Sequence, residues 1–106
     1  HKEDMRRCGQ QACKIIKAMG GQAELIETNG NPVVVGEFHQ DKKFPTVTIY
    51  NHIDVQPADP SEWKSHPFEM KIEADKYLGR GSTDDKGPAL SVLYAAKYAH
   101  ENAVPI

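Results

Sequence analysis

The sequence has few cysteines, no excess of charge of one sign and no long apolar run, and each absence excludes a class of protein. Cys8 and Cys13 are the only cysteines in 106 residues. They lie five positions apart in a predicted helix, so they point to different faces and do not indicate a disulfide framework. The net charge of -2 leaves no broad basic face for a nucleic acid. The longest aliphatic stretch, residues 33–35, is far shorter than the roughly 20 residues that cross a bilayer. We therefore expect a chain without nucleic-acid or membrane partners, located in a reducing cytoplasm.

The composition, with 39% hydrophobic and 26% charged residues, is that of a single globular domain with a modest core. Near the start, apolar side chains recur at intervals of three and four residues, which predicts an amphipathic helix over residues 4–19. Its expected apolar face consists of Met5, Cys8, Ala12, Ile15 and Met19. Gly20 and Gly21 are expected to end this helix.

Three strands are predicted in the next thirty residues. Residues 22–28 and 33–38 flank a turn sequence, Asn-Gly-Asn-Pro, that is typical of a hairpin. Residues 46–50 alternate between apolar and polar side chains, which predicts a further strand that leads directly to His52.

The second half of the chain is expected to begin with a long ordered loop. Residues 56–67 contain three prolines and several acidic side chains, which exclude regular structure. Residues 68–72 and 76–78 predict a second hairpin, and a helix is expected from Pro88 to about Glu101. Helices and strands thus alternate along the chain, which indicates an α/β fold.

His52 and Asp54 form the most informative polar pair, because they lie two positions apart at the end of a predicted strand. Alternate residues of a strand point to the same side, so the two side chains can lie together. An imidazole that binds a metal usually donates its other ring N–H to a carboxylate, which fixes its tautomer and direction. The pair therefore permits a metal ligand with an orienting carboxylate, and a solvated surface or turn histidine is the alternative.

Asp84, Asp85 and Lys86 form a second polar cluster, 32 positions beyond His52 and just before the last predicted helix. Aspartates in this place commonly cap a helix and favour the positive end of its dipole. Ligand sites of open α/β sheets also gather at junctions of this kind. One imidazole with one carboxylate would suit a hard or borderline cation. Helix capping and metal binding are therefore both open for these aspartates.

Four segments occur in an order and spacing that carry a resemblance. They are residues 50–57 (YNHIDVQP), Trp63, residues 66–68 (HPF) and residues 78–88 (LGRGSTDDKGP). Together they resemble successive signatures of the metallopeptidase family that contains carnosinases, aminoacylases and succinyl-diaminopimelate desuccinylase. The resemblance covers most of the chain, and the Gln-Pro after the His-x-Asp pair is more similar to the dipeptidase branch than to the desuccinylase branch.

The resemblance implies roles for individual residues. His52 is expected to bind one metal, and Asp84 is expected to bridge two through its two carboxylate oxygens. Asp54 is expected to be the catalytic carboxylate that orients His52. Asp85 is not assigned as a ligand, because other members tolerate residues there that cannot bind metal. The implied cofactors are two divalent metal ions, zinc or manganese.

The resemblance also implies a fold and a domain organisation. The expected architecture is a three-layer α/β domain, with a mixed sheet and flanking helices, incomplete in this chain. Residues 1–106 are expected to be the amino-terminal part of the catalytic domain, without the lid or dimerisation domain and the carboxyl-terminal part. The general base and the remaining ligands should lie in those missing parts. We therefore expect a homodimeric full-length enzyme and an inactive fragment.

The function that follows is metal-dependent hydrolysis of a dipeptide by the full-length enzyme. The expected substrate is a small peptide, and the first alternative is an N-acyl amino acid cleaved by a deacylase of the same family. A second alternative is a non-catalytic interaction module derived from the fold.

Three further residues complete the expectations. Asn51 departs from the glycine that the family usually has, and a side chain there can alter the backbone at His52. Arg80 is expected to pair with a nearby carboxylate. Trp63 is expected to anchor packing, with a substrate platform as the alternative.

Overall fold

The computed structural model describes residues 2–106, which divide into two compact units. The first unit contains residues 2–50 together with residues 91–106, and the second contains residues 51–90. Among the helices of residues 2–106, none is long and apolar enough to cross a membrane. The mixture of helices and strands in both units confirms the predicted α/β class.

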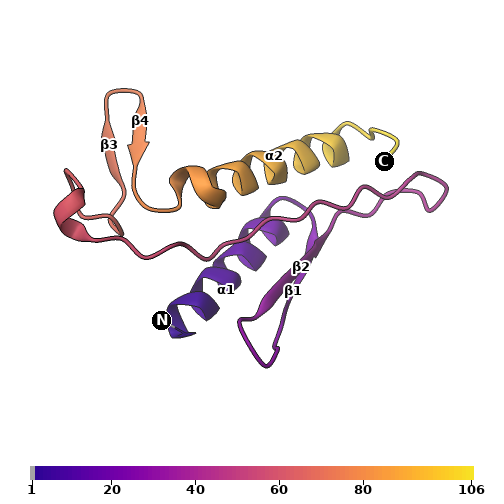
Figure 1. Cartoon of the computed structure of the whole chain (residues 1–106). Helices are drawn as coiled ribbons and strands as arrows, with labels where there is room; N and C mark the ends of the chain where they lie inside the picture. Colours follow the sequence, from indigo (N-terminus) through magenta and orange to yellow (C-terminus); the bar gives the residue numbers. More distant parts are fainter. Residues whose placement is uncertain (1) are drawn as a thin grey trace. The chain divides into compact units, whose positions relative to one another are not determined.

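The first unit consists of a helix packed on a hairpin (Figure 1). Helix α1 (Lys2–Ala18) contacts strands β1 (Gln22–Ile26) and β2 (Val33–Glu37). The strands pair antiparallel, with Gln22 opposite Glu37 and Ile26 opposite Val33. Alternate residues of a strand face opposite sides, so Leu25 and its partner Val34 point to the less exposed face. The predicted helix and hairpin are confirmed, each within two residues of the expected bounds.

The buried face of α1 differs from the predicted one by about one residue. The buried positions are Gly9, Cys13 and Ile16, while the predicted face is only half-buried. The physical reason is the missing side chain at Gly9. A Cβ atom placed there would lie 2.6 Å from Leu25 Cδ1, so any larger residue would force the Leu25 side chain to shift, and glycine lets the hairpin approach this side of the helix as it stands. The predicted face was built from apolar side chains, and glycine has none, so the periodicity could not identify Gly9 as a contact residue.

The last helix, α2 (Gly87–Glu101), begins in the second unit and ends in the first. Its end is bound by a side chain from the loop after β2. The Gln40 amide Nε2 donates to the carbonyl oxygens of Val104, at 2.8 Å, and Ala99, at 3.4 Å. Ala99 O also accepts from the Val104 N–H at 2.9 Å, so Gln40 contacts the backbone turn that ends α2.

The second unit contains the predicted hairpin and two short helical turns. Strands β3 (Lys71–Glu73) and β4 (Lys76–Leu78) pair antiparallel. The turn η1 (Pro60–Glu62) interrupts the proline-rich loop, and the Asp59 carboxylate caps it by accepting from Ser61 N at 2.9 Å. The π-type turn η2 (Ser82–Lys86) precedes α2 and is broken by the non-helical backbone of Asp84. The two sheets of residues 2–106 are thus two antiparallel pairs.

The strand predicted over residues 46–50 is wrong for the described chain. Residues 45–59 belong to no helix or strand. The apolar half of the alternation stays largely exposed, with 58% of Val47 and 53% of Ile49 accessible. A strand needs a neighbour that accepts and donates its backbone hydrogen bonds, and no strand of residues 2–106 pairs with this segment.

Candidate metal centre

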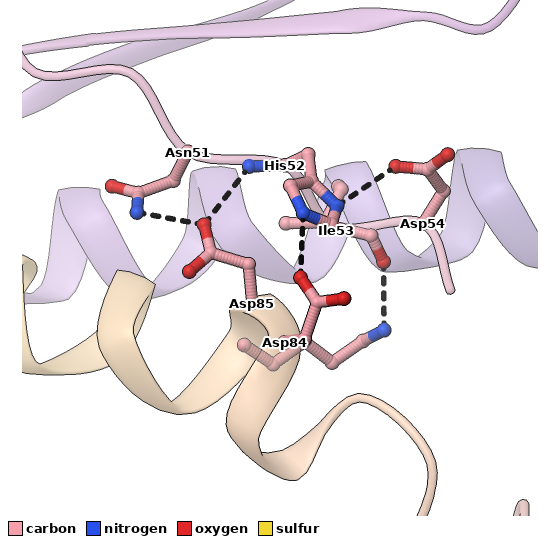
Figure 2. A network of polar contacts seen from close by, with 7 residues as sticks. Asn51, His52, Ile53, Asp54, Asp84 and Asp85 are labelled. Atoms are coloured by element: carbon pink, nitrogen blue, oxygen red, sulfur yellow. Dashed lines mark hydrogen bonds and ion pairs between the residues drawn. The ribbon is translucent and has the colours of Figure 1, made fainter. Parts of the chain in front are cut away.

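The second unit brings His52 between two carboxylates (Figure 2). His52 Nε2 lies 2.9 Å from Asp84 Oδ1, and His52 Nδ1 lies 3.2 Å from Asp54 Oδ1. His52 and Asp54 come from the segment of irregular backbone, while Asp84 comes from the kink in η2. The three residues singled out from the sequence therefore contact one another, although Asp84 is 32 positions from His52.

The electrostatics of this contact favour a positive charge at His52. Desolvation is the largest single influence and lowers the pKa of the imidazole. The hydrogen bonds and negative charge of Asp84 and Asp54 oppose it and together raise the pKa above the ordinary value of 6.5. Asp84 is the most open of the three, with 74% of its side chain exposed against 38% for His52. The two carboxylates thus favour a cation at His52, and the Asp84 carboxylate is accessible to solvent.

Asp85 takes a different part in the same region. Its Oδ2 accepts from Asn51 Nδ2 at 2.8 Å and from the backbone N–H of His52 at 3.2 Å. The hydrogen bond from Asn51 is the main reason that the pKa of Asp85 is lowered, with a smaller contribution from His52. The observed partners of both aspartates lie in residues 51–52, which favours a site over simple helix capping. The peptide bond between the two aspartates is cis.

Lys86 gives a third contact between the same two segments. Its Nζ donates to the carbonyl oxygen of Ile53 at 2.7 Å (Figure 2). The tight backbone before α2 also depends on Gly87, because a Cβ atom there would collide with the carbonyl oxygen of Ser82. Sequence reasoning missed both features. The one signal available in the sequence was the Lys-Gly pair, Lys86 and Gly87, that follows the two aspartates.

Arg80 does not have the carboxylate partner that we expected. Within residues 2–106 its guanidinium pairs with no acidic side chain. It lies over the ring of Trp63, with 5.1 Å between Cζ and the ring centroid. The face of an indole carries negative charge density and attracts a cation, so the ring replaces the carboxylate. This contact agrees with Trp63 as a packing anchor. Arg80 Nε is buried and has no hydrogen-bond partner.

The donor atoms present fit part of a metal-binding site. An imidazole nitrogen and a carboxylate oxygen are common ligands of zinc, and the contact from Asp54 to Nδ1 is of the kind that orients a ligating histidine. Zinc sites normally have three or four protein ligands. In the described part of the chain, no group of three or more His, Cys, Asp or Glu side chains is arranged to hold a metal ion. The ligand types are therefore those of a metal site, but these residues supply fewer ligands than such a site needs.

Known proteins with similar sequence and structure include metal-dependent peptidases. A Cys-Gly metallodipeptidase of Candida albicans is 48% identical over 84 residues, which are 74% of this chain and 17% of the relative. The crystal structure of an M20 family metallo-carboxypeptidase from Sulfolobus solfataricus matches 90% of this chain and 22% of its own, with a TM-score of 0.82 and 39% identity.

The crystal structure of human carnosine dipeptidase 1 matches with a TM-score of 0.81 and 27% identity, over 95% of this chain and 24% of the human one. The chain thus spans less than a quarter of the length of each of these three proteins. The sequence model of peptidase family M20/M25/M40 matches residues 48–106, which include His52, Asp54 and Asp84. Because this match extends over more than half of the sequence, the chain belongs to peptidase family M20/M25/M40.

Proposed function

We propose that residues 1–106 are the amino-terminal part of the catalytic domain of a dipeptidase and supply ligands to its metal centre. His52 binds one divalent ion, Asp84 bridges two, and Asp54 orients the imidazole. The observation that carries this proposal is the position of His52 between the carboxylates of Asp54 and Asp84, the second of which is 32 positions away in the chain. We propose zinc or manganese as the metal, since both accept imidazole and carboxylate ligands.

The division of labour follows from the contacts. When bound, two such ions supply Lewis-acid polarisation of an amide carbonyl and activation of water for hydrolysis. Asp54 holds the Nδ1 side of His52, which leaves Nε2 directed toward Asp84 as a metal ligand. Asp84 is largely exposed and has a second carboxylate oxygen, which is what a bridging ligand requires. The general base and the remaining ligands come from outside these 106 residues, as do the lid and the dimer contacts.

A dipeptide is the proposed substrate, because two of the similar proteins are named as dipeptidases. The Sulfolobus protein is named as a carboxypeptidase, which favours a longer peptide as the second candidate. Cys8 and Cys13 form no disulfide, which supports a cytoplasmic location for the enzyme.

Calorimetric titration with zinc and with manganese tests the metal ligands. His52→Ala and Asp84→Ala should each abolish binding by the 106-residue chain, because each removes one of its two proposed ligands. His39→Ala is the matched control, since His39 Nε2 also contacts a carboxylate, that of Glu37 at 2.7 Å, outside the site. Loss of binding in the control, or unchanged binding in His52→Ala, would overturn the placement of the metal.

The substrate class is tested separately on the full gene product. Cys-Gly, an N-acetylated amino acid and a longer peptide should be offered under identical conditions. Fastest hydrolysis of the dipeptide supports the proposal. Preference for the longer peptide would favour a carboxypeptidase, and preference for the acylated amino acid would favour a deacylase. Hydrolysis by residues 1–106 alone would contradict the view that the general base lies elsewhere.

A further inference from the structure

We infer that Asp85 and Asn51 form a positioning pair that holds the backbone of His52 and thereby directs its imidazole toward Asp84. This inference deepens the proposed metal site and rests on it for its functional consequence. The contact pattern is the basis. Three consecutive residues, Asp84 to Lys86, each contact the segment 51–53, but only Asp85 contacts its backbone at His52 itself (Figure 2).

The segment around His52 needs such a contact, because it makes no regular backbone hydrogen bonds of a helix or sheet. Residues 45–59 form neither helix nor strand, so no regular backbone hydrogen bonds fix the peptide plane of His52. The direction of a side chain depends on the backbone angles that precede it. A carboxylate that accepts the His52 N–H therefore restricts where the imidazole can point. Asp85 is well placed for this, because its other partner, Asn51, is the immediately preceding residue.

Asp85 and Asp84 are adjacent in the sequence but differ in the contacts that their carboxylates make. Both hydrogen bonds of Asp85 use one oxygen, Oδ2, and the donors are the Asn51 side-chain amide and the His52 backbone N–H. Asp84 Oδ1 contacts only an imidazole, which can exchange that contact for a metal, and most of the Asp84 side chain is exposed. Asp84 is therefore available as a ligand, whereas Asp85 is occupied in holding the segment that presents the other ligand.

Asn51 supplies one half of the arrangement. Its Nδ2 supplies the shorter of the two hydrogen bonds to Asp85, at 2.8 Å. A glycine at this position would leave only the 3.2 Å contact from the His52 N–H. We therefore expect a graded series, in which removal of the Asn51 side chain weakens the hold on His52 and removal of the Asp85 carboxylate abolishes it.

The experiment compares Asp85→Ala with Asp85→Asn in the 106-residue chain. An amide oxygen at residue 85 in the place of Oδ2 can still accept from both the His52 N–H and Asn51 Nδ2. Asp85→Asn thus preserves the hydrogen bonds while removing the charge. We expect Asp85→Ala to lower the zinc affinity about tenfold, as loss of a group that orients a ligand does. Asp85→Asn should change the zinc affinity by less than about threefold.

A second pair of variants tests the partnership directly. Asn51→Asp places two carboxylates together and should weaken zinc binding as Asp85→Ala does. Asn51→Asp combined with Asp85→Asn restores a hydrogen bond between the two side chains but turns an amide NH2 toward the His52 N–H, because a single atom of residue 85 contacts both partners. The affinity should therefore stay low in this double variant. Equal losses in Asp85→Asn and Asp85→Ala would mean that Asp85 acts through its charge or as a ligand, which overturns the inference. An unchanged affinity in Asp85→Ala would also overturn it.

Hydrogen exchange of the His52 backbone amide, followed by NMR without metal, separates this inference from the proposed function. Exchange should accelerate in Asp85→Ala and remain slow in Asp85→Asn, whether or not zinc binds. If His52→Ala and Asp84→Ala leave zinc binding intact while the amide behaves as expected, the metal assignment fails and the backbone contact stands. If the amide exchanges equally fast in all variants, the positioning pair itself is refuted.

Discussion

Each of the two units of the chain is stabilised internally by a different kind of interaction. In the first unit a helix packs on a hairpin, and this unit contains the buried hydrophobic residues Cys13, Ile16 and Ala99, whereas the second unit buries Pro67. In the second unit the hairpin residues are mostly exposed, and polar contacts from Asp85 and Lys86 join its two halves. Apolar burial therefore stabilises the first unit, while directional hydrogen bonds set the geometry of the second.

This difference suits the chemistry proposed for the second unit. Apolar contacts are non-directional and cannot fix the angle of an imidazole, whereas hydrogen bonds can. Regions with little buried apolar surface also open more readily than packed cores. The site is thus built in the unit where hydrogen bonds specify the geometry but little apolar surface is buried. Substitutions in each unit can test whether these two properties are separable.

The largest expected effect belongs to the apolar unit. Ile16→Ala removes a side chain that is only 5% exposed. It should lower the free energy of unfolding by about 3 kcal/mol, through lost burial and the cavity left behind. Urea unfolding followed by circular dichroism measures this. Ile26→Ala, at a residue that is 40% exposed, is the control and should cost much less. The comparison breaks down if Ile16→Ala weakens zinc binding under native conditions.

An intermediate effect is expected at the turn before α2. Gly87→Ala places a methyl group against the carbonyl oxygen of Ser82, so the backbone that carries Asp84 and Asp85 must shift. Overpacking of this kind costs about 1–3 kcal/mol. The measurement is zinc affinity together with exchange of the His52 amide. Gly30→Ala is the control, because a Cβ there meets only the Thr28 hydroxyl at 3.8 Å. Equal behaviour of the two variants would show that the turn does not shape the site.

The smallest effect concerns the loop between the site segments. Accepting hydrogen bonds from the backbone and hydroxyl of Ser61 lowers the pKa of Asp59 below its ordinary 3.8. A carboxyl with a lowered pKa in the folded state stabilises that state above its ordinary pKa. The contribution disappears as the pH falls through the lowered value. The Ser61 amide shift should therefore titrate below pH 3.8, and Asp59→Asn should remove that titration. A midpoint at or above 3.8 would contradict the cap.

Several elements were predictable because their causes are local. The α1 helix and the β1–β2 hairpin follow from periodicity and turn residues, and both occur where expected. The site residues were found through motif resemblance. A family motif marks residues that meet in space, but it does not explain why the chain brings them together. Residues 46–50 were predicted as a strand from their alternation, but alternation indicates only that a segment can pair. Whether it does depends on a neighbour that the pattern does not contain.

The sequence by itself determined the class of the chain and the approximate bounds of its helices and first hairpin, since these depend on residue type and spacing. The candidate residues His52, Asp54 and Asp84 were also found from the sequence, through its resemblance to a known family. Only the tertiary structure decided which face of α1 is buried, because a glycine contributes by the absence of a side chain. It alone joined Asn51 to Asp85 and Arg80 to Trp63. Such pairs depend on how distant segments of the chain are brought together in space, and no local pattern encodes that arrangement.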